Sequence, residues 1–187
     1  DNILSYLKKE GPVEPNITAG LSNTFRYKNW ELSALITVAA GNKIRKPDQY
    51  SVDYNDLSIF PKEMRNRWIN PGDEKVTNIP AIADKRTVNE VGRATLRRVY
   101  NAYNYSTERV VDGSFVRMKS IGLSYAFPKE VLDQLKVSNL TLRLQTANPF
   151  LIYSDKNLNG QDPEYYKSGG VSLPTPKQYT LSFQIGF

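Results

Sequence analysis

The last residues of the chain, KQYTLSFQIGF (residues 177–187), decide how it folds. From Tyr179 onward every second residue is large and apolar: Tyr179, Leu181, Phe183, Ile185 and Phe187. The residues between them are small or polar. Such alternation is typical of a β-strand, because successive side chains point to opposite faces of a sheet. The end of the chain is therefore predicted to be a strand with one apolar face, held in place up to its aromatic last residue.

The same alternation occurs in four other segments, residues 16–27, 30–41, 114–127 and 139–153. With the terminal segment, 177–187, the sequence predicts five strands of about 11 to 15 residues. Strands of globular proteins mostly have five or six residues, whereas strands that cross a bilayer in a barrel need about nine to eleven. Strand length therefore favours a transmembrane β-barrel.

The connections between these strands alternate in length. Lys28-Asn29 and residues 128–138 are short, whereas residues 42–113 and 154–176 are long and polar. Membrane barrels show this asymmetry, with short periplasmic turns and long external loops. On this interpretation the five apolar side chains of the last strand face lipid, the long loops are extracellular and the C-terminus is periplasmic. The alternative is a strand of a soluble sandwich, whose apolar face would meet a dry core.

Composition limits the chemistry that the chain can perform. It contains no cysteine and no histidine, which excludes thiol nucleophiles, zinc–thiolate sites and catalysis by histidine within it. The net charge is +6, but the densest basic cluster, Arg93, Arg97 and Arg98, is interrupted and predicts no continuous face for nucleic acid. No stretch reaches the ~18 apolar residues of a transmembrane helix. We expect neither an enzyme nor a nucleic-acid-binding protein, and no cofactor.

Several motifs in the second half of the chain resemble one known family. DGSFVRMKSIGLSYAFP (residues 112–128) is similar to the family's D-G-S-F-x-R-L-K-N strand, and NLTLRLQTANPF (residues 139–150) to the strand after it. The triplet DPE at 162–164 corresponds to its G-x-D-P-E loop, and PTPK at 174–177 to its P-x-P-[RK] approach to the last strand. Together they resemble the C-terminal barrel region of the SusC/RagA family of TonB-dependent outer-membrane transporters.

The resemblance implies a 22-stranded barrel filled by an N-terminal plug, of which this chain is the C-terminal five strands without the plug. Five strands cannot close, since bacterial single-chain barrels begin at eight. We therefore expect a fragment, a split subunit or the end of a longer polypeptide.

The resemblance also implies a function and partners. The function is TonB-dependent import of oligomeric nutrients, glycans or peptides, across the outer membrane of a Gram-negative bacterium. The implied partners are a SusD-like surface lipoprotein, the rest of the barrel and plug, membrane lipid, and the TonB complex reached through the missing N-terminal part.

The long loops hold the residues that could contact cargo or a partner. Most are aromatic, and such side chains either stack on ligands or pack the loop itself. The candidates are Tyr50, Tyr54, Trp68, Tyr100, Tyr103, Tyr105, Asp162, Tyr165 and Tyr166.

Two alternatives stay open at this point. Asp155, Asn157, Asn159 and Gly160 match the first half of a calcium-binding loop, but Tyr166 stands where a bidentate glutamate belongs, so a hydrogen-bonded turn is expected and no metal site. For the whole chain, the alternative to a transporter is a soluble all-β carbohydrate-binding module. That module would purify from buffer, whereas a membrane barrel partitions into detergent.

Overall fold

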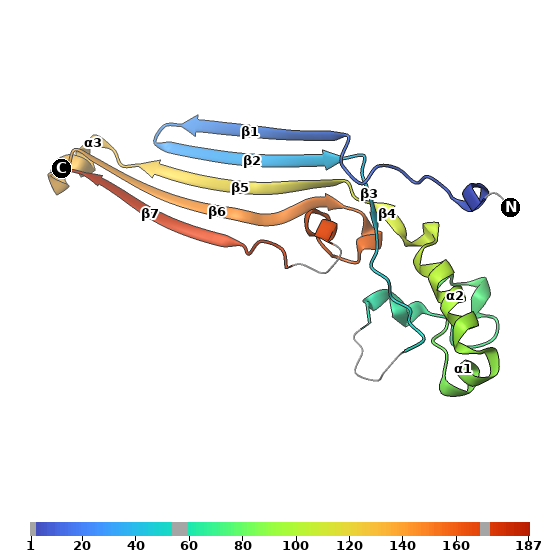
Figure 1. The fold of residues 1–187 in the computed structure, drawn as a ribbon. Coiled ribbons are helices and arrows are strands. Elements are labelled where there is room, and N and C mark those ends of the chain that lie inside the picture. Colours follow the sequence, from blue (N-terminus) through green and yellow to red (C-terminus); the bar gives the residue numbers. More distant parts are fainter. Residues whose placement is uncertain (1–2, 54–59, 169–172) are drawn as a thin grey trace.

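A long antiparallel sheet dominates the computed structural model, which describes residues 3–53, 60–168 and 173–187 (Figure 1). Its strands follow one another in the order β1-β2-β5-β6-β7. They are β1 (Ile17–Tyr27), β2 (Trp30–Ala40), β5 (Phe115–Ala126), β6 (Asn139–Ser154) and β7 (Gln178–Gly186). Each end lies within one residue of the range expected from the alternation. The all-β, antiparallel fold class is confirmed.

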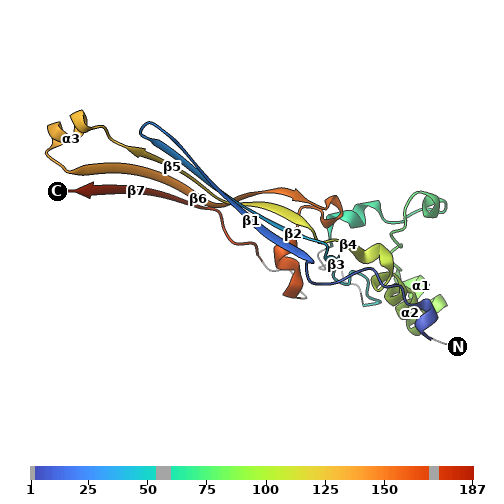
Figure 2. The same cartoon turned by 90° about the horizontal axis from the view of Figure 1, so that it is seen from above.

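Short and long connections lie at opposite ends of this twisted sheet (Figures 1 and 2). The β1–β2 turn, helix α3 (Lys129–Leu135) and the C-terminus share one end. The long loops share the other end, and they contain β3 (Lys43–Arg45), β4 (Val110–Asp112), α1 (Lys85–Val91) and α2 (Arg93–Asn104). β3 and β4 pair with each other in a separate two-stranded sheet. One end of the sheet therefore carries only short connections, and the other end carries both long loops.

Short helices make up the rest of the regular structure. The 3-10 helices are Ile3–Tyr6, Lys62–Asn66, Asp73–Lys75, Thr107–Arg109, Lys156–Leu158 and Pro163–Ser168. Helix α1 begins after Asp84, whose carboxylate accepts a hydrogen bond from the Thr87 N–H at 2.7 Å. Within the described ranges, no helix is both long enough and apolar enough to cross a bilayer.

The strand register gives the sheet one apolar and one polar face. One row across all five strands is Phe25, Leu32, Leu123, Leu144 and Leu181. The next row, which points to the opposite face, is Thr24, Ser33, Gly122, Gln145 and Thr180. The described residues place no second layer over the apolar face: Leu181, Phe183 and Ile185 are 59%, 65% and 50% exposed. The dry core that a soluble sandwich requires is not formed by this part of the chain.

Aromatic side chains gather where the apolar face reaches the α3 end of the sheet. The rings of Trp30 and Tyr125 have centroids 4.6 Å apart, and Phe127 lies 5.1 Å from Tyr125. Tyr27 is opposite Trp30 in the register, so the group crosses three strands.

A bulge shifts the phase of the alternation in the middle of β5. Lys119 is an extra residue there, because Leu35 pairs with Ser120 and Ile36 pairs with Met118. The bulge places Arg117 in a row with Thr37 and Leu151 on the polar face. Bulges redirect side chains in this way, and here the consequence is a buried arginine near the long loops.

Strand β6 extends beyond its neighbour β7. It pairs with β5 as far as Ser154 but with β7 only as far as Ala147. Asn148 has a positive φ of 51° where the register shifts. The chain that leads into β7 contains Pro174 and Pro176, which have no N–H group to donate to a ladder. Residues 148–154 thus keep one edge without a partner strand in the described part of the chain.

The DGS motif forms the corner between β4 and β5. Asp112 accepts a hydrogen bond from the Ser114 hydroxyl at 2.9 Å, and Ser114 Oγ accepts one from the Gly41 N–H at 3.1 Å. Gly113 is required by space, because a Cβ there would lie 2.3 Å from Asn42 Nδ2. The motif therefore fixes how the long loop joins the sheet.

Candidate functional site

The long loops pack together at the end of the sheet away from α3, and their described residues form one outer module (residues 42–113 and 154–176). Its first core consists of Ile44 from β3, Val111 from β4 and Leu158 from the second loop, with Tyr166 packed against them. Leu158 is 1% exposed. The second loop therefore completes a core that β3 and β4 start.

The second core of the outer module is built from Tyr50, Met64 and Tyr100. The Tyr50 and Tyr100 rings lie 5.1 Å apart, and the Tyr50 hydroxyl donates a hydrogen bond to the Pro80 carbonyl. The Tyr100 hydroxyl accepts a hydrogen bond from the Ala83 N–H at 2.8 Å. Burial raises the pKa of Tyr50, so its hydroxyl stays protonated and keeps donating. These tyrosines hold the loop together.

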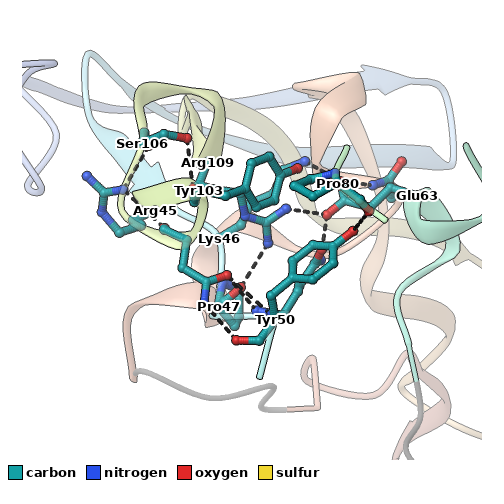
Figure 3. Close-up of polar contacts among 12 residues, drawn as sticks. Arg45, Lys46, Pro47, Tyr50, Glu63, Pro80, Tyr103, Ser106 and Arg109 are labelled. Atoms are coloured by element: carbon teal, nitrogen blue, oxygen red, sulfur yellow. Dashed lines mark hydrogen bonds and ion pairs between the residues drawn. The ribbon is translucent and has the colours of Figure 1, made fainter. Parts of the chain in front are cut away.

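Glu63 is the polar centre of the outer module (Figure 3). Its carboxylate accepts hydrogen bonds from Lys46 Nζ at 2.6 Å, Gln49 Nε2 at 2.5 Å and Arg109 Nη1 at 2.5 Å. Asn159 of the second loop donates a further hydrogen bond at 3.2 Å. One carboxylate thus connects distant segments of the first loop to each other and to the second loop.

The same carboxylate makes the outer module sensitive to acid. Burial alone would raise the Glu63 pKa, but the hydrogen bonds from Lys46, Arg109 and Gln49 outweigh burial and hold the pKa below its ordinary value of 4.5. Because the pKa of Glu63 is lower in the folded protein than in the unfolded chain, the ionised carboxylate stabilises the fold at every pH above the pKa that it has in the unfolded chain. This stabilisation is lost as the pH falls through the folded pKa.

We therefore expect limited proteolysis of the full-length protein to cut the outer module more readily as the pH is lowered below about 4.5. Glu63→Gln should be cut more readily than the wild type at neutral pH and should change less on acidification, because it cannot titrate. Glu90→Gln, on an exposed ion pair of α1, is the matched control and should behave as the wild type. An identical pH profile for Glu63→Gln and the wild type would contradict this role.

The DPE triplet at 162–164 is bound to the sheet by ion pairs. Arg117 of β5 pairs with Asp162, and its Nε lies 2.9 Å from Glu164 Oε2. Lys119 Nζ lies 3.0 Å from Glu164 Oε1. The R-x-K and D-P-E motifs, which resemble the family separately, are therefore partners in space. From the sequence, Asp162 was a candidate site residue, whereas Arg117 and Lys119 were noted only as part of the strand motif, although two cations and two acids at matching spacing were a usable signal.

The acids of the second loop are engaged in contacts other than metal binding. Asp155 accepts hydrogen bonds from the Asn157 N–H at 2.9 Å and the Asp112 N–H at 3.0 Å. Asp162 and Glu164 are paired with cations. Across the described ranges, no group of three or more aspartate or glutamate side chains gathers at one point. The calcium-like stretch is built as a hydrogen-bonded turn.

The aromatic candidates of the first loop differ in how far the structure exposes them to solvent. The expectation that Tyr50, Tyr100 and Tyr103 contact cargo is not supported, because the first two are buried and Tyr103 packs edge-on against Tyr50. Trp68 and Tyr105 are exposed. Tyr54 lies outside the described residues.

The candidates of the second loop come together around a pocket of about 600 Å³. Asp162, Tyr165 and Tyr166 line it together with Asn148, Phe150 and Leu151 of β6 and with residues 173–177. The Tyr165 and Thr175 hydroxyls are hydrogen-bonded to each other, which ties two walls together. This pocket lies beside the free edge of β6.

Comparison with known proteins gives relatives by sequence. No protein-family model matches the chain. TonB-dependent receptor P39 of Formosa agariphila is 26% identical over 163 residues, which cover 85% of this chain and 14% of that receptor. TonB-dependent receptor P26 of the same organism is 27% identical over 191 aligned positions, gaps included, which cover 95% of this chain and 17% of that receptor. The chain thus spans less than a fifth of the length of these relatives.

Solved structures of the RagAB peptide importer share the fold. The importer in its open-open state matches with a TM-score of 0.65 and 23% identity, over 96% of this chain and 18% of that chain. Its closed-closed state matches with a TM-score of 0.64. At this identity the likeness shows the fold alone, but it agrees with the relatives found by sequence. The resemblance inferred from the motifs is confirmed: the chain is similar in sequence to TonB-dependent receptors over most of its length, and it shares the fold of the RagAB importer.

Proposed function

We propose that the chain is the C-terminal part of the barrel wall of a TonB-dependent nutrient importer in the outer membrane of a Gram-negative bacterium. The observation that carries this proposal is the apolar face that crosses all five strands and that the described residues leave uncovered. Lipid covers such a face in a membrane barrel, and the polar face lines the interior. Tyr179, Leu181, Phe183, Ile185 and Phe187 are then the lipid-facing residues of β7.

The ends of the sheet support an orientation. The aromatic group of Trp30, Tyr125 and Phe127 fits the boundary between hydrocarbon and water, where membrane barrels carry aromatic girdles. The short connections lie at this end and the outer module at the other. This arrangement favours a periplasmic C-terminus and extracellular long loops.

The two edges of the sheet support a larger barrel. β1 and β7 each pair with one neighbour only in the described part of the chain. An unpaired strand edge in hydrocarbon leaves backbone groups without hydrogen bonds, each at a cost of several kcal/mol. Further strands on both sides, up to the 22 of the family, and a plug inside would complete the barrel.

The outer module is placed to meet cargo and a surface partner. The importer is proposed to take oligomeric nutrients, peptides or glycans, and to pass them unchanged, with a SusD-like lipoprotein above the barrel and TonB coupling through the plug. Among the described residues of the first loop, Trp68 and Tyr105 are exposed aromatic side chains that are available for this contact.

The test uses the complete polypeptide in its native bacterium. We expect the protein to fractionate with the outer membrane and to require detergent, and its deletion to abolish uptake of a fluorescent peptide or oligosaccharide that depends on the proton-motive force. Recovery from buffer without detergent would instead support the soluble carbohydrate-binding module.

A further inference from the structure

We propose that the pocket between β6 and the second loop binds a peptide in extended conformation, which adds as a strand to the free edge of β6. This inference rests on the proposed importer and names peptide as its class of cargo. It is carried by the juxtaposition of an apolar pocket with a strand edge and a lysine, Lys177, neither of which has a partner among the residues that the structure describes.

The edge provides the backbone contacts. Residues 148–154 continue β6 beyond its last pair with β7, Ala147 with Gln178, while the other edge remains paired with β5. The prolines at 174 and 176 prevent the preceding chain from forming the missing ladder. Pro149 has no N–H group, so the donors that this edge can offer lie in residues 150–154. A peptide can pair its own N–H and C=O groups with this stretch, which is the common mode of strand addition.

The pocket provides room for side chains. Its volume of about 600 Å³ lies in the range that small ligands fill, ~300–1,000 Å³. Phe150, Leu151, Leu173 and Pro174 contribute an apolar lining. Strand addition obtains specificity from such pockets, because every second side chain of the added strand enters them.

The charges of the pocket select an acidic or C-terminal group. Arg117 lines the pocket but is already paired with Asp162 and Glu164. Lys177 is exposed at the wall and forms no ion pair with any residue that the structure describes. A carboxylate of the ligand would pair with Lys177 without displacing another acid.

A peptide fits this pocket better than a glycan does. Each ring of a glycan carries several hydroxyl groups, and burying a hydroxyl group without a hydrogen-bond partner is costly. Tyr166 is packed against the core of Ile44, Val111 and Leu158, and the Tyr165 hydroxyl is bonded to Thr175. The available contacts are therefore a strand edge and apolar walls, which match a polypeptide backbone and its side chains.

The experiment measures binding to the complete transporter in detergent by calorimetry. The probes are a linear pentapeptide of alternating valine and leucine with a free carboxylate, its C-terminal amide, its backbone N-methylated form, and maltopentaose. Leu151→Trp fills the pocket, and Ile152→Trp, the next residue of the same strand and not part of the pocket lining, is the matched control. Lys177→Ala removes the cation.

We expect Leu151→Trp to weaken binding of the free pentapeptide about tenfold or more, and Ile152→Trp to change it less than about twofold. N-methylation should abolish binding, since it removes backbone donors. Amidation of the peptide and Lys177→Ala should each weaken binding severalfold, and the two changes together should weaken it no further than either alone.

Equal affinity for the N-methylated and unmodified peptides, or equal effects of the two tryptophan variants, would overturn the peptide site. So would competition by maltopentaose at the same affinity, or no binding of the pentapeptide at all. Normal outer-membrane location with normal uptake would show in these cases that the proposed importer stands while this inference fails. The N-methylated probe acts on the wild type, so the test does not depend on any variant folding.

Discussion

Leu181→Arg is expected to be among the most damaging single substitutions in the sheet. Leu181 lies near the middle of β7, opposite Leu144, on the apolar face that is proposed to meet hydrocarbon. A charged side chain on the lipid face of a membrane barrel costs about 2–4 kcal/mol near the midplane of the bilayer. Unfolding of the full-length barrel in lipid vesicles by denaturant, followed by its tryptophan fluorescence, should show a loss of folding free energy of this size.

The neighbouring residue gives a matched control for this prediction. Thr180 belongs to the polar row, one residue along the same strand, and Thr180→Arg places the same charge on the interior face. We expect Thr180→Arg to change the free energy of folding by less than about 1 kcal/mol. The proposal of a lipid-facing row fails if both variants lose the same stability, or if Leu181→Arg is as stable as the wild type.

Arg117→Ala is expected to release the second loop from the sheet. Arg117 is buried and carries the positive charge that compensates Asp162 and Glu164. Removing one partner of a buried ion pair costs about 3–5 kcal/mol, because the remaining charge is left without compensation. Hydrogen exchange of the full-length protein should therefore rise in residues 155–168, together with a lower unfolding midpoint.

Two arginines of the polar face allow a controlled comparison. Arg143 is exposed on the same face and forms no ion pair with the described residues, so Arg143→Ala should leave exchange in the second loop unchanged. Lys119→Ala should have a smaller effect than Arg117→Ala, because Lys119 is more exposed and Arg117 still holds both acids. Equal exchange in Arg117→Ala and Arg143→Ala would show that the ion pairs do not hold the loop.

The five long strands could be predicted from the sequence, because the alternation of apolar and polar residues at every second position is a direct consequence of strand geometry. The positions of the five long strands and the order of long and short connections agree with the structure, whereas the short strands β3 and β4 at the two ends of the first loop were not predicted. The bulge at Lys119 could not be predicted from β5 alone. Counting back from Ile121 in steps of two would place Arg117 on the apolar face, and only the pairing with β2 shows that it lies on the polar face. Helices α1 and α2 were also missed, although Leu96, Tyr100 and Asn104 of α2 stand four residues apart, as on one face of a helix. The packing of α2 against Tyr50 and Met64 joins residues that are distant in sequence, so no local pattern reveals it.

The candidate site was predictable only in part. Aromatic residues in a loop look the same in a sequence whether they pack the loop or await a ligand, and Tyr50 and Tyr100 proved to be packing residues. Asp162, Tyr165 and Tyr166 do line one pocket, yet its wall from β6 depends on where β7 stops pairing. That stop is a property of two strands together, which neither segment reveals alone.

The shared core of the two long loops has a consequence for how such transporters diversify. Leu158 and Asn159 belong to one loop but complete the apolar core and the Glu63 cluster of the other. A recombination event or an engineered graft that replaced only residues 42–113 would leave these two side chains facing an unmatched surface. The two segments are therefore expected to be inherited and exchanged as a pair, although the strands β5 and β6 separate them along the gene.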